Sequence, residues 1–159
     1  MFKVGDKVVY PLYGAGTVEA VEDKLIDGVK ANYYVLNVPV GNLKITVSVR
    51  KSEALGLRSI HTKAEVADII KNAVPIPMSA NWTQRNKDNM EILKSGDLFK
   101  IVGVFKTLIL RERVRSLSSI EKKLLGTAKQ IILTEIILSQ DVDKHGAEVM
   151  LNESMLVSA

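Results

Sequence analysis

The chain carries one tryptophan, Trp82, and the residues around it could bind nucleic acid. Arg85 follows one helical turn later and Lys87 five residues later. A large aromatic side chain can insert at a base step of a distorted duplex while neighbouring cations neutralise phosphates. The same pattern fits a tryptophan that packs at a helix start or between two modules. Composition alone favours the packing interpretation.

Two further groups of basic residues follow Trp82 along the chain. Arg111, Arg113 and Arg115 fall near the end of an expected helix, where cations complement the helix dipole. Lys122 and Lys123 fall in the first turn of the next helix, where positive charge is mildly unfavourable. An external anion such as a phosphate would compensate these two lysines.

Positive charge is concentrated in one part of the chain. The net charge of the 159 residues is only +4, yet residues 82–130 hold 11 Lys and Arg against 5 Asp and Glu. Such a concentration is expected for a protein that binds a polyanion, and a solvated helical face gives the same count. Charge alone therefore leaves both interpretations open.

Enzymatic chemistry has little support in the sequence. Cys is absent, which excludes a cysteine nucleophile, an iron–sulfur cluster and a thiolate metal site. His61 and His145 are isolated, so neither suits a catalytic pair or a metal site, and both are expected at the surface. The stretch 14–16 is Gly-rich but lacks the lysine and the helix of a P-loop. We predict a non-enzyme without cofactor or metal.

Membrane insertion is not expected either. The apolar stretch Ile131–Leu138 is interrupted by Thr134 and Glu135 and is far shorter than the roughly 20 residues that a bilayer requires. The N-terminus has no apolar segment followed by a cleavage site. The sequence predicts a cytoplasmic protein with no membrane partner.

Short β-branched and aromatic runs fill the first part of the chain. Turn signals rich in Pro, Gly and Asn separate them, and Asp27-Gly28 is typical of a hairpin. This pattern predicts a small antiparallel barrel or strongly bent sheet over residues 1–57. The expected strands are 7–10, 16–21, 33–38 and 43–49.

The rest of the chain has the 3.6-residue periodicity of helices. Thr62 with Glu65, and Ser118 with Glu121, have capping-box spacing, whereas Pro75 and Pro77 mark a break. The fold class is therefore α+β, with a β module over 1–57 and a compact all-helical domain over 58–159; packing between them stays open. The expected helices are 62–72, 81–94, 97–115, one from 118, and 144–157.

Several motifs follow one another along nearly the whole chain: Phe2 to Pro11, Gly14-Ala15-Gly16, Asn81-Trp82, Arg85, Ser95-Gly96-Asp97 and Ser118 to Lys123. In this order they closely resemble the CarD/CdnL-type bacterial transcription regulators. The N-terminal motif alone is shared with transcription-repair coupling factors, and the Trp-bearing helical half separates the two. The resemblance implies a Tudor-like β module that docks on the β subunit of RNA polymerase and a helical domain that touches promoter DNA.

The resemblance also implies roles for residues of the helical domain. Trp82 matches the position that wedges into the minor groove at the upstream edge of the transcription bubble and stabilises the open complex, which overturns the packing interpretation. Arg85, Lys87 and Lys122 match residues that contact the DNA backbone, and we extend this prediction to Lys123. The implied DNA contact has no base-sequence code.

The polymerase contact is carried over to two segments of the β module. One is Lys24, Leu25 and Ile26, and the other is Lys44, Ile45 and Thr46. Thr46 stands where relatives can present Arg, so that side-chain contact is weaker, although a sheet edge can still pair through its backbone. We expect a monomer that partners with polymerase and promoter DNA.

Two other functions remain as alternatives. In the first, the chain is an adaptor on RNA polymerase whose helical domain binds another protein, with Trp82 as the anchor of that interface. In the second, the small barrel binds RNA, but the β half lacks a clustered basic and aromatic platform. Steep salt dependence would favour nucleic acid over a protein partner.

Overall fold

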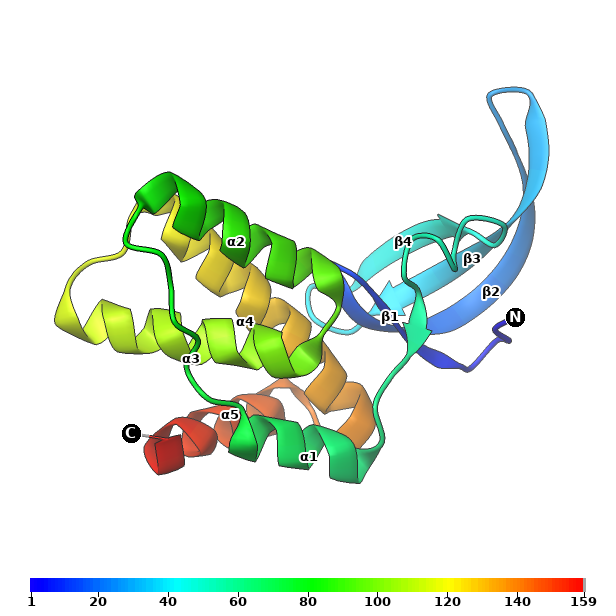
Figure 1. Cartoon of the computed structure of the whole chain (residues 1–159). Helices are drawn as coiled ribbons and strands as arrows, with labels where there is room; N and C mark the ends of the chain where they lie inside the picture. The colour runs from blue at the N-terminus through cyan, green and yellow to red at the C-terminus, as the bar shows by residue number, and fades with distance from the viewer. Residues whose placement is uncertain (159) are drawn as a thin grey trace.

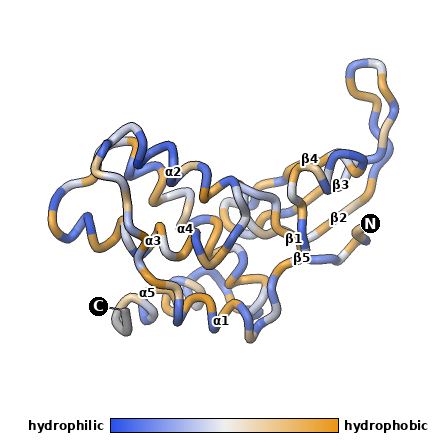
Figure 2. Tube along the Cα trace, viewed as in Figure 1, coloured by the Kyte–Doolittle hydropathy of each residue, from blue (hydrophilic) through white to orange (hydrophobic). Residues whose placement is uncertain are grey.

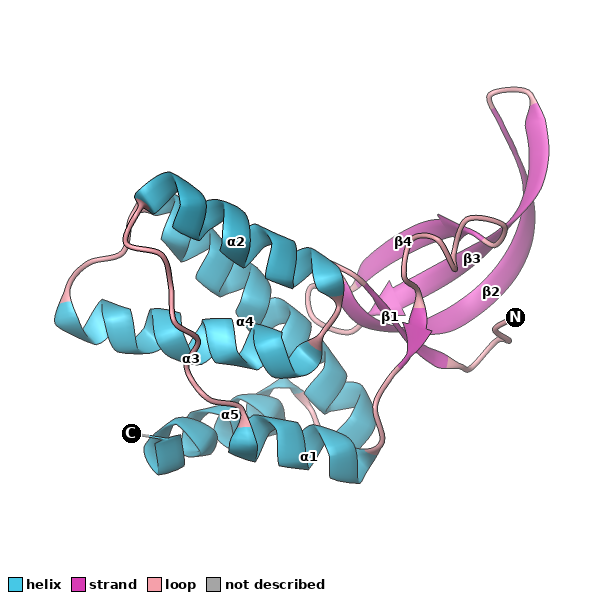
Figure 3. Ribbon diagram, viewed as in Figure 1, coloured by secondary structure: helices cyan, strands magenta, loops and turns pink. Residues whose placement is uncertain are grey.

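A computed structural model describes the backbone of residues 1–158 and the side chains of residues 1–155. A bent antiparallel sheet forms one side of the molecule and five helices form the other (Figures 1 and 3). The α+β prediction is confirmed. Ala159, the last residue of the expected helical domain, lies outside the described residues.

The sheet has five strands, and every neighbouring pair is antiparallel. Its strand order is β4-β3-β2-β1-β5, so β4 and β5 are the edge strands. The short β5 pairs with β1, which extends the sheet to Ser59, two residues beyond the expected boundary at residue 57. The strands are β1 (Lys7–Tyr10), β2 (Gly14–Ile26), β3 (Val29–Val38), β4 (Leu43–Ser48) and β5 (Arg58–Ser59).

The hairpin of β2 and β3 extends well past the rest of the sheet (Figure 1). The sequence predicted that the second strand ends at Val21, but pairing continues to Ile26 opposite Val29. Beyond Tyr33, which pairs with the end of β4 at Ser48, the hairpin has no further strand beside it among the described residues. Its exposed end carries apolar side chains.

Four of the five helices begin at the capping residues that the sequence predicted. Both capping boxes form, with the Thr62 and Ser118 hydroxyls accepting hydrogen bonds from the N–H groups of Glu65 and Glu121. Asn81 and Asp97 cap the two helices between them. The helices are α1 (Lys63–Asn72), α2 (Trp82–Ser95), α3 (Leu98–Val114), α4 (Ser119–Gln140) and α5 (Lys144–Ser158).

The sheet and the helices each have their own apolar core. Residues from two turns of the sheet also pack against the core of the helices. Hydrophobic positions recur along the amphipathic helices (Figure 2). Leu12 and Val40, from turns between strands, pack against the helical core. At Gly14 (φ 107°) an added Cβ would clash with the Thr134 hydroxyl, so only glycine permits this approach of β2 to α4.

A buried carboxylate on α4 ties the sheet to the helices. Glu135 is fully buried; one oxygen lies 3.1 Å from Nη2 of Arg58, and the other lies 2.8 Å from Nδ1 of His61 and accepts the His61 N–H at 2.9 Å. Arg58 also donates to the Gly96 carbonyl. His61 was expected at the surface, but its side chain is only 30% exposed because it packs into this joint.

A buried lysine anchors α1 on α3. Lys106 is fully buried, and its Nζ donates to the carbonyls of Ile70 and Ala73 at the C-terminal end of α1. Burial lowers the pKa of this ammonium group. One cation counted in the basic segment is therefore structural and is not displayed at the surface.

No helix within residues 1–158 is long and apolar enough to cross a bilayer.

Candidate nucleic-acid and polymerase interfaces

Three helix ends meet where the sequence placed Trp82. The start of α2, the end of α3 and the start of α4 lie together at one end of the helical bundle (Figure 1). Trp82 is the first residue of α2, and the Asn81 side chain caps the helix by accepting the Gln84 N–H at 2.9 Å. Trp82 is 48% exposed, so a rigid helix start presents a large aromatic surface to solvent.

A buried ionic cluster holds these helix ends together. Oε2 of Glu121 lies 3.4 Å from Nε of Arg85 and 3.2 Å from Nε of Arg111. The Arg85 guanidinium also donates to the carbonyls of Ser79 and Ala80, just before α2. One carboxylate of α4 thus links α2, α3 and the segment that leads into Trp82.

This cluster changes the role of one predicted DNA contact. Arg85 was expected to meet the DNA backbone, but it is only 5% exposed because it folds inward onto Glu121 and the segment before α2. Its guanidinium is therefore not displayed to a phosphate. We assign Arg85 a positioning role, in which it fixes the helix turn that carries Trp82.

The pKa of Glu121 lies below its ordinary value. Burial opposes ionisation of this carboxyl, but the Ser118 backbone and side chain, Arg111 and Arg85 together outweigh that effect. Glu121 is therefore ionised at neutral pH, and the cations Arg85 and Arg111 neutralise its charge inside the bundle. The negative charge of this helix end does not reach the surface.

The predicted lysines are placed differently from Arg85. Lys87, Lys122 and Lys123 are exposed, and none forms an ion pair with a described residue. Lys122 and Lys123 directly follow Glu121, whose Arg85 partner lies one turn from Trp82. The structure therefore brings an exposed aromatic side chain and unpaired cations to one end of the bundle.

The predicted polymerase segment Lys44, Ile45 and Thr46 lies on the edge strand β4. This strand pairs with β3 on one side, and no described strand covers its other side. Lys44 and Thr46 are exposed, with Lys44 3.4 Å from the Glu19 carboxylate, whereas Ile45 packs against the core of the sheet. The free edge can add a strand from a partner through backbone hydrogen bonds.

The other predicted segment, Lys24, Leu25 and Ile26, lies on the projecting hairpin. Leu25 is 73% exposed and Ile26 43%, and Val29 on the returning strand is 63% exposed. Lys24 lies 3.6 Å from the Glu22 carboxylate on the same strand. The two segments therefore form separate surfaces, a backbone edge and an apolar hairpin end.

Comparison with known protein families agrees with both halves of the molecule. A family model described as "CarD-like/TRCF RID domain" matches residues 2–61, and one described as "CarD, C-terminal domain" matches residues 65–152. This chain belongs to the CarD family. It is also 29% identical over 144 residues to YdeB of Bacillus subtilis (strain 168), whose name describes a candidate transcription factor. That match covers 86% of this chain and 90% of YdeB.

Membership in the CarD family bears on several of the predictions. The family resemblance is confirmed, and the domains of this family are those of non-catalytic transcription factors. The first domain implies an interaction with RNA polymerase. The DNA contact and the individual site residues stay predictions.

The spacing of the sequence did not reveal the supports of this CarD-family site. Glu121 was identified only as part of a capping box, and Arg111 only as a cation at a helix end. Their pairing depends on how α2, α3 and α4 pack, which the periodicity of one helix does not show. Val29 was missed, although its place directly after the Asp27-Gly28 turn was a usable signal.

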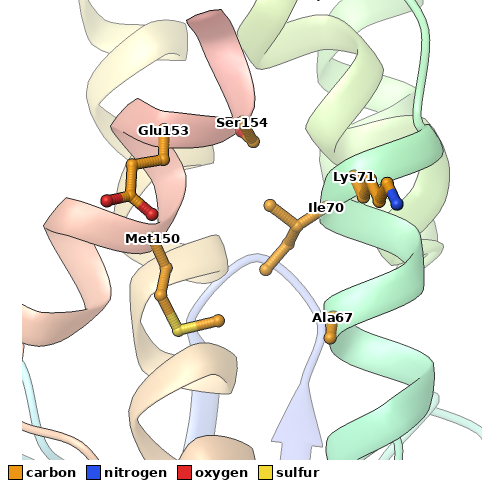
Figure 4. Close-up of a pocket in the computed structure, with 6 residues that line it drawn as sticks. All are labelled: Ala67, Ile70, Lys71, Met150, Glu153 and Ser154. Carbon is orange, nitrogen blue, oxygen red and sulfur yellow. The ribbon is translucent and has the colours of Figure 1, made fainter. Parts of the chain in front are cut away.

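A separate pocket of about 220 Å³ lies between α1 and α5 (Figure 4). Ala67, Ile70 and Met150 give it an apolar lining, with Lys71 and Glu153 at its sides. None of the predicted contact residues lines it. Within the described part of the chain, no three His, Asp or Glu side chains gather where a metal ion could be held.

Proposed function

We propose that this CarD-family protein is a cytoplasmic regulator of transcription initiation that stabilises the open promoter complex. Its β module binds the β subunit of RNA polymerase, and its helical domain contacts promoter DNA at the upstream edge of the bubble. The observation that carries this proposal is the 48% exposure of Trp82 at a capped helix start, above the buried Arg85–Glu121–Arg111 cluster.

The rigidity of this support matters for a wedge mechanism. Inserting an apolar side chain between base steps costs a few kcal/mol of unstacking, which the contacts of the bound state must offset. A side chain that is already held in place loses little conformational freedom on binding. The Asn81 cap and the ionic cluster hold the backbone that carries Trp82, so the helix start needs no ordering on binding.

Open-complex stabilisation follows from differential binding. A factor that contacts melted promoter DNA better than closed DNA shifts the equilibrium by that difference in free energy. Lys87, Lys122 and Lys123 would supply backbone contacts that carry no sequence information. Tethering to polymerase would raise the local concentration of this weak DNA contact.

Two surfaces support the polymerase contact. The unpaired edge of β4 suits strand addition, in which backbone groups of the partner provide most of the bonding. The hairpin end adds exposed apolar area at Leu25, Ile26 and Val29. Because strand addition depends little on side-chain identity, Thr46 is compatible with binding.

The test is the lifetime of an open complex of bacterial RNA polymerase, challenged with a competitor. We expect the wild type to prolong the lifetime and Trp82→Ala to lose this effect while still binding polymerase. Phe99→Ala is the matched control, because Phe99 is a similarly exposed aromatic residue (46%) at the start of α3, away from the cluster. A wild type that binds polymerase without changing the lifetime would refute the mechanism.

A second candidate function is an adaptor whose helical domain binds another protein. It is favoured by two further apolar side chains at this end of the bundle, Val114 (85% exposed) and Ile120 (43%). Such an interface would show little salt dependence and would tolerate Lys122→Ala. DNA contact predicts steep loss of activity with salt and a deficit in Lys122→Ala.

A further inference from the structure

The exposed face of α4 carries charge of one sign only. Both carboxylates of this helix, Glu121 and Glu135, are buried and paired with cations from other elements. Its three lysines, Lys122, Lys123 and Lys129, are exposed and have no ion pair with the described residues. The helix therefore places its negative charge inside the molecule and its positive charge outside.

A glycine interrupts this face where a side chain would be tolerated. Gly126 is exposed in the interior of α4, and a Cβ added there would meet no atom of the described side chains or backbone within 4 Å. Glycine destabilises a helix interior relative to alanine, and no contact with a described residue accounts for it here. A bare stretch of helix backbone is useful where a partner must approach closely.

Gly126 lies one helical turn from the lysines on either side. Lys122 and Lys123 precede it by four and three residues, and Lys129 follows it by three, which places all of them on neighbouring positions of one face. From Lys122 to Lys129 the helix rises about 10 Å. This length matches about three phosphate steps of one strand along a duplex axis.

The same face opens into a groove between the two modules. One hollow of about 440 Å³ lies between Lys123, Gly126 and Thr127 of α4 and two residues of the β module, Tyr13 in a turn and Leu43 at the start of β4. A second hollow of about 140 Å³ is lined by Gly126, Lys129 and Lys144, and Glu148 of α5 also lines it. Gln130 lines both hollows. The glycine thus lies where the groove crosses the helix.

We propose that the Lys122–Lys129 face of α4 is a track for the sugar-phosphate backbone of nucleic acid, which passes over Gly126 and enters the groove beside the β module. The inference rests on the proposed function and extends it from the Trp82 end of the bundle to the joint between the modules. The lysines neutralise successive phosphates, and Thr127 lines the hollow that the strand enters. The contact reads no sequence, since it reaches no base edge.

The experiment measures binding of the full chain to a fluorescently labelled duplex with an internal unpaired bubble, over a series of KCl concentrations. We expect Lys129→Gln to reduce the slope of log Kobs against log salt by about 0.9, the value for one lost phosphate contact. Lys71→Gln, at an exposed lysine of α1 outside the face, is the matched control and should keep the wild-type slope.

Gly126→Gln tests the close approach without changing charge. A glutamine improves helix propensity and has open space, so the variant should melt about 1–3 °C above the wild type. It should nevertheless lower the salt slope by about 1 to 2, because the phosphates on either side are held away from the lysines. A more stable protein that binds DNA less well excludes misfolding as the cause.

The outcomes separate this inference from the proposed function. If Lys122→Gln lowers the slope but Lys129→Gln and Gly126→Gln match the wild type, the track is refuted and the Trp82 contact stands. If Lys122→Gln and Trp82→Ala also bind like the wild type, both proposals fail. If polyglutamate competes as well as DNA at equal charge concentration, the face recognises acidic protein and the nucleic-acid track is refuted.

Discussion

The two ends of α4 each bury one carboxylate, and the two carboxylates serve different purposes. Glu121, near the start of α4, links this helix to the start of α2 and the end of α3 beside Trp82. This end of the molecule is open to a partner. Glu135 joins α4 to Arg58 and His61 at the boundary between sheet and helices. A buried carboxylate paired with arginine therefore supports the exposed Trp82 at one end of α4 and fastens the sheet to the helices at the other.

The comparison shows that burial of charge does not by itself identify a functional site. Both carboxylates are at least 96% buried by side-chain area, yet only the surroundings of Glu121 combine exposed aromatic and unpaired basic residues. At the Glu121 end, the buried ion pairs hold the helix ends, while Trp82 and the nearby lysines stay exposed to solvent. The distinction can be tested by removing each carboxylate and measuring stability and activity separately.

The largest effect on stability is expected at the joint. Glu135→Ala should lower the free energy of unfolding by about 3–4 kcal/mol, because Arg58 and the His61 N–H lose a fully buried partner. Urea unfolding would measure the change. Glu112→Ala, on the exposed face of α3, is the control and should stay within about 0.5 kcal/mol of the wild type. A loss at Glu135 below about 1 kcal/mol would contradict this role.

An intermediate, pH-dependent effect is expected at Glu121. Glu121→Gln should cost about 2 kcal/mol at neutral pH, since it leaves the buried Arg85 without its anion. The pKa of Glu121 in the folded state is lower than its ordinary value of 4.5, so its charge stabilises the fold above that value. This stabilisation is lost as pH falls through the lowered folded-state pKa. Unfolding measured across the acid range should show the variant's deficit shrinking; a deficit independent of pH would argue against the ionic role.

The smallest effect on stability is expected at Trp82. Because Trp82 is 48% exposed, Trp82→Ala should change the free energy of unfolding by about 1 kcal/mol or less. The same variant should lose open-complex stabilisation completely, so activity and stability separate at this residue. A loss of stability as large as that of Glu135→Ala would mean that Trp82 is a core residue.

Much of the fold could be predicted because its signals are local. Thr62 with Glu65 and Ser118 with Glu121 form capping boxes within four residues of sequence, and both appear in the structure. The long hairpin was underestimated because both of its faces meet solvent beyond the sheet, so no apolar alternation marks the strands there. The strand β5 has two residues and no periodicity to detect.

The candidate site was less accessible to sequence reasoning. Trp82 and Lys122 are exposed, as a DNA contact requires, but their roles stay predictions; the Trp82 role came from a family resemblance, since composition alone favoured a packed tryptophan. The burial of Arg85 was not foreseen, because its partner Glu121 comes from a helix distant in sequence and spacing on one helix does not show what lies across from it. His61 was misjudged for the same reason.

The joint around Glu135 also fixes the distance between the edge of the sheet and Trp82. Gly14 against Thr134, the Arg58–Glu135 pair and the Gln130 side chain bound to the Val40 carbonyl attach the sheet to α4 at several separate points. In the proposed complex, the strand edge that meets polymerase and the tryptophan that meets DNA then belong to one rigid spacer. Base pairs are stacked about 3.4 Å apart, so a change in this joint of only that size would move the wedge to the next base step.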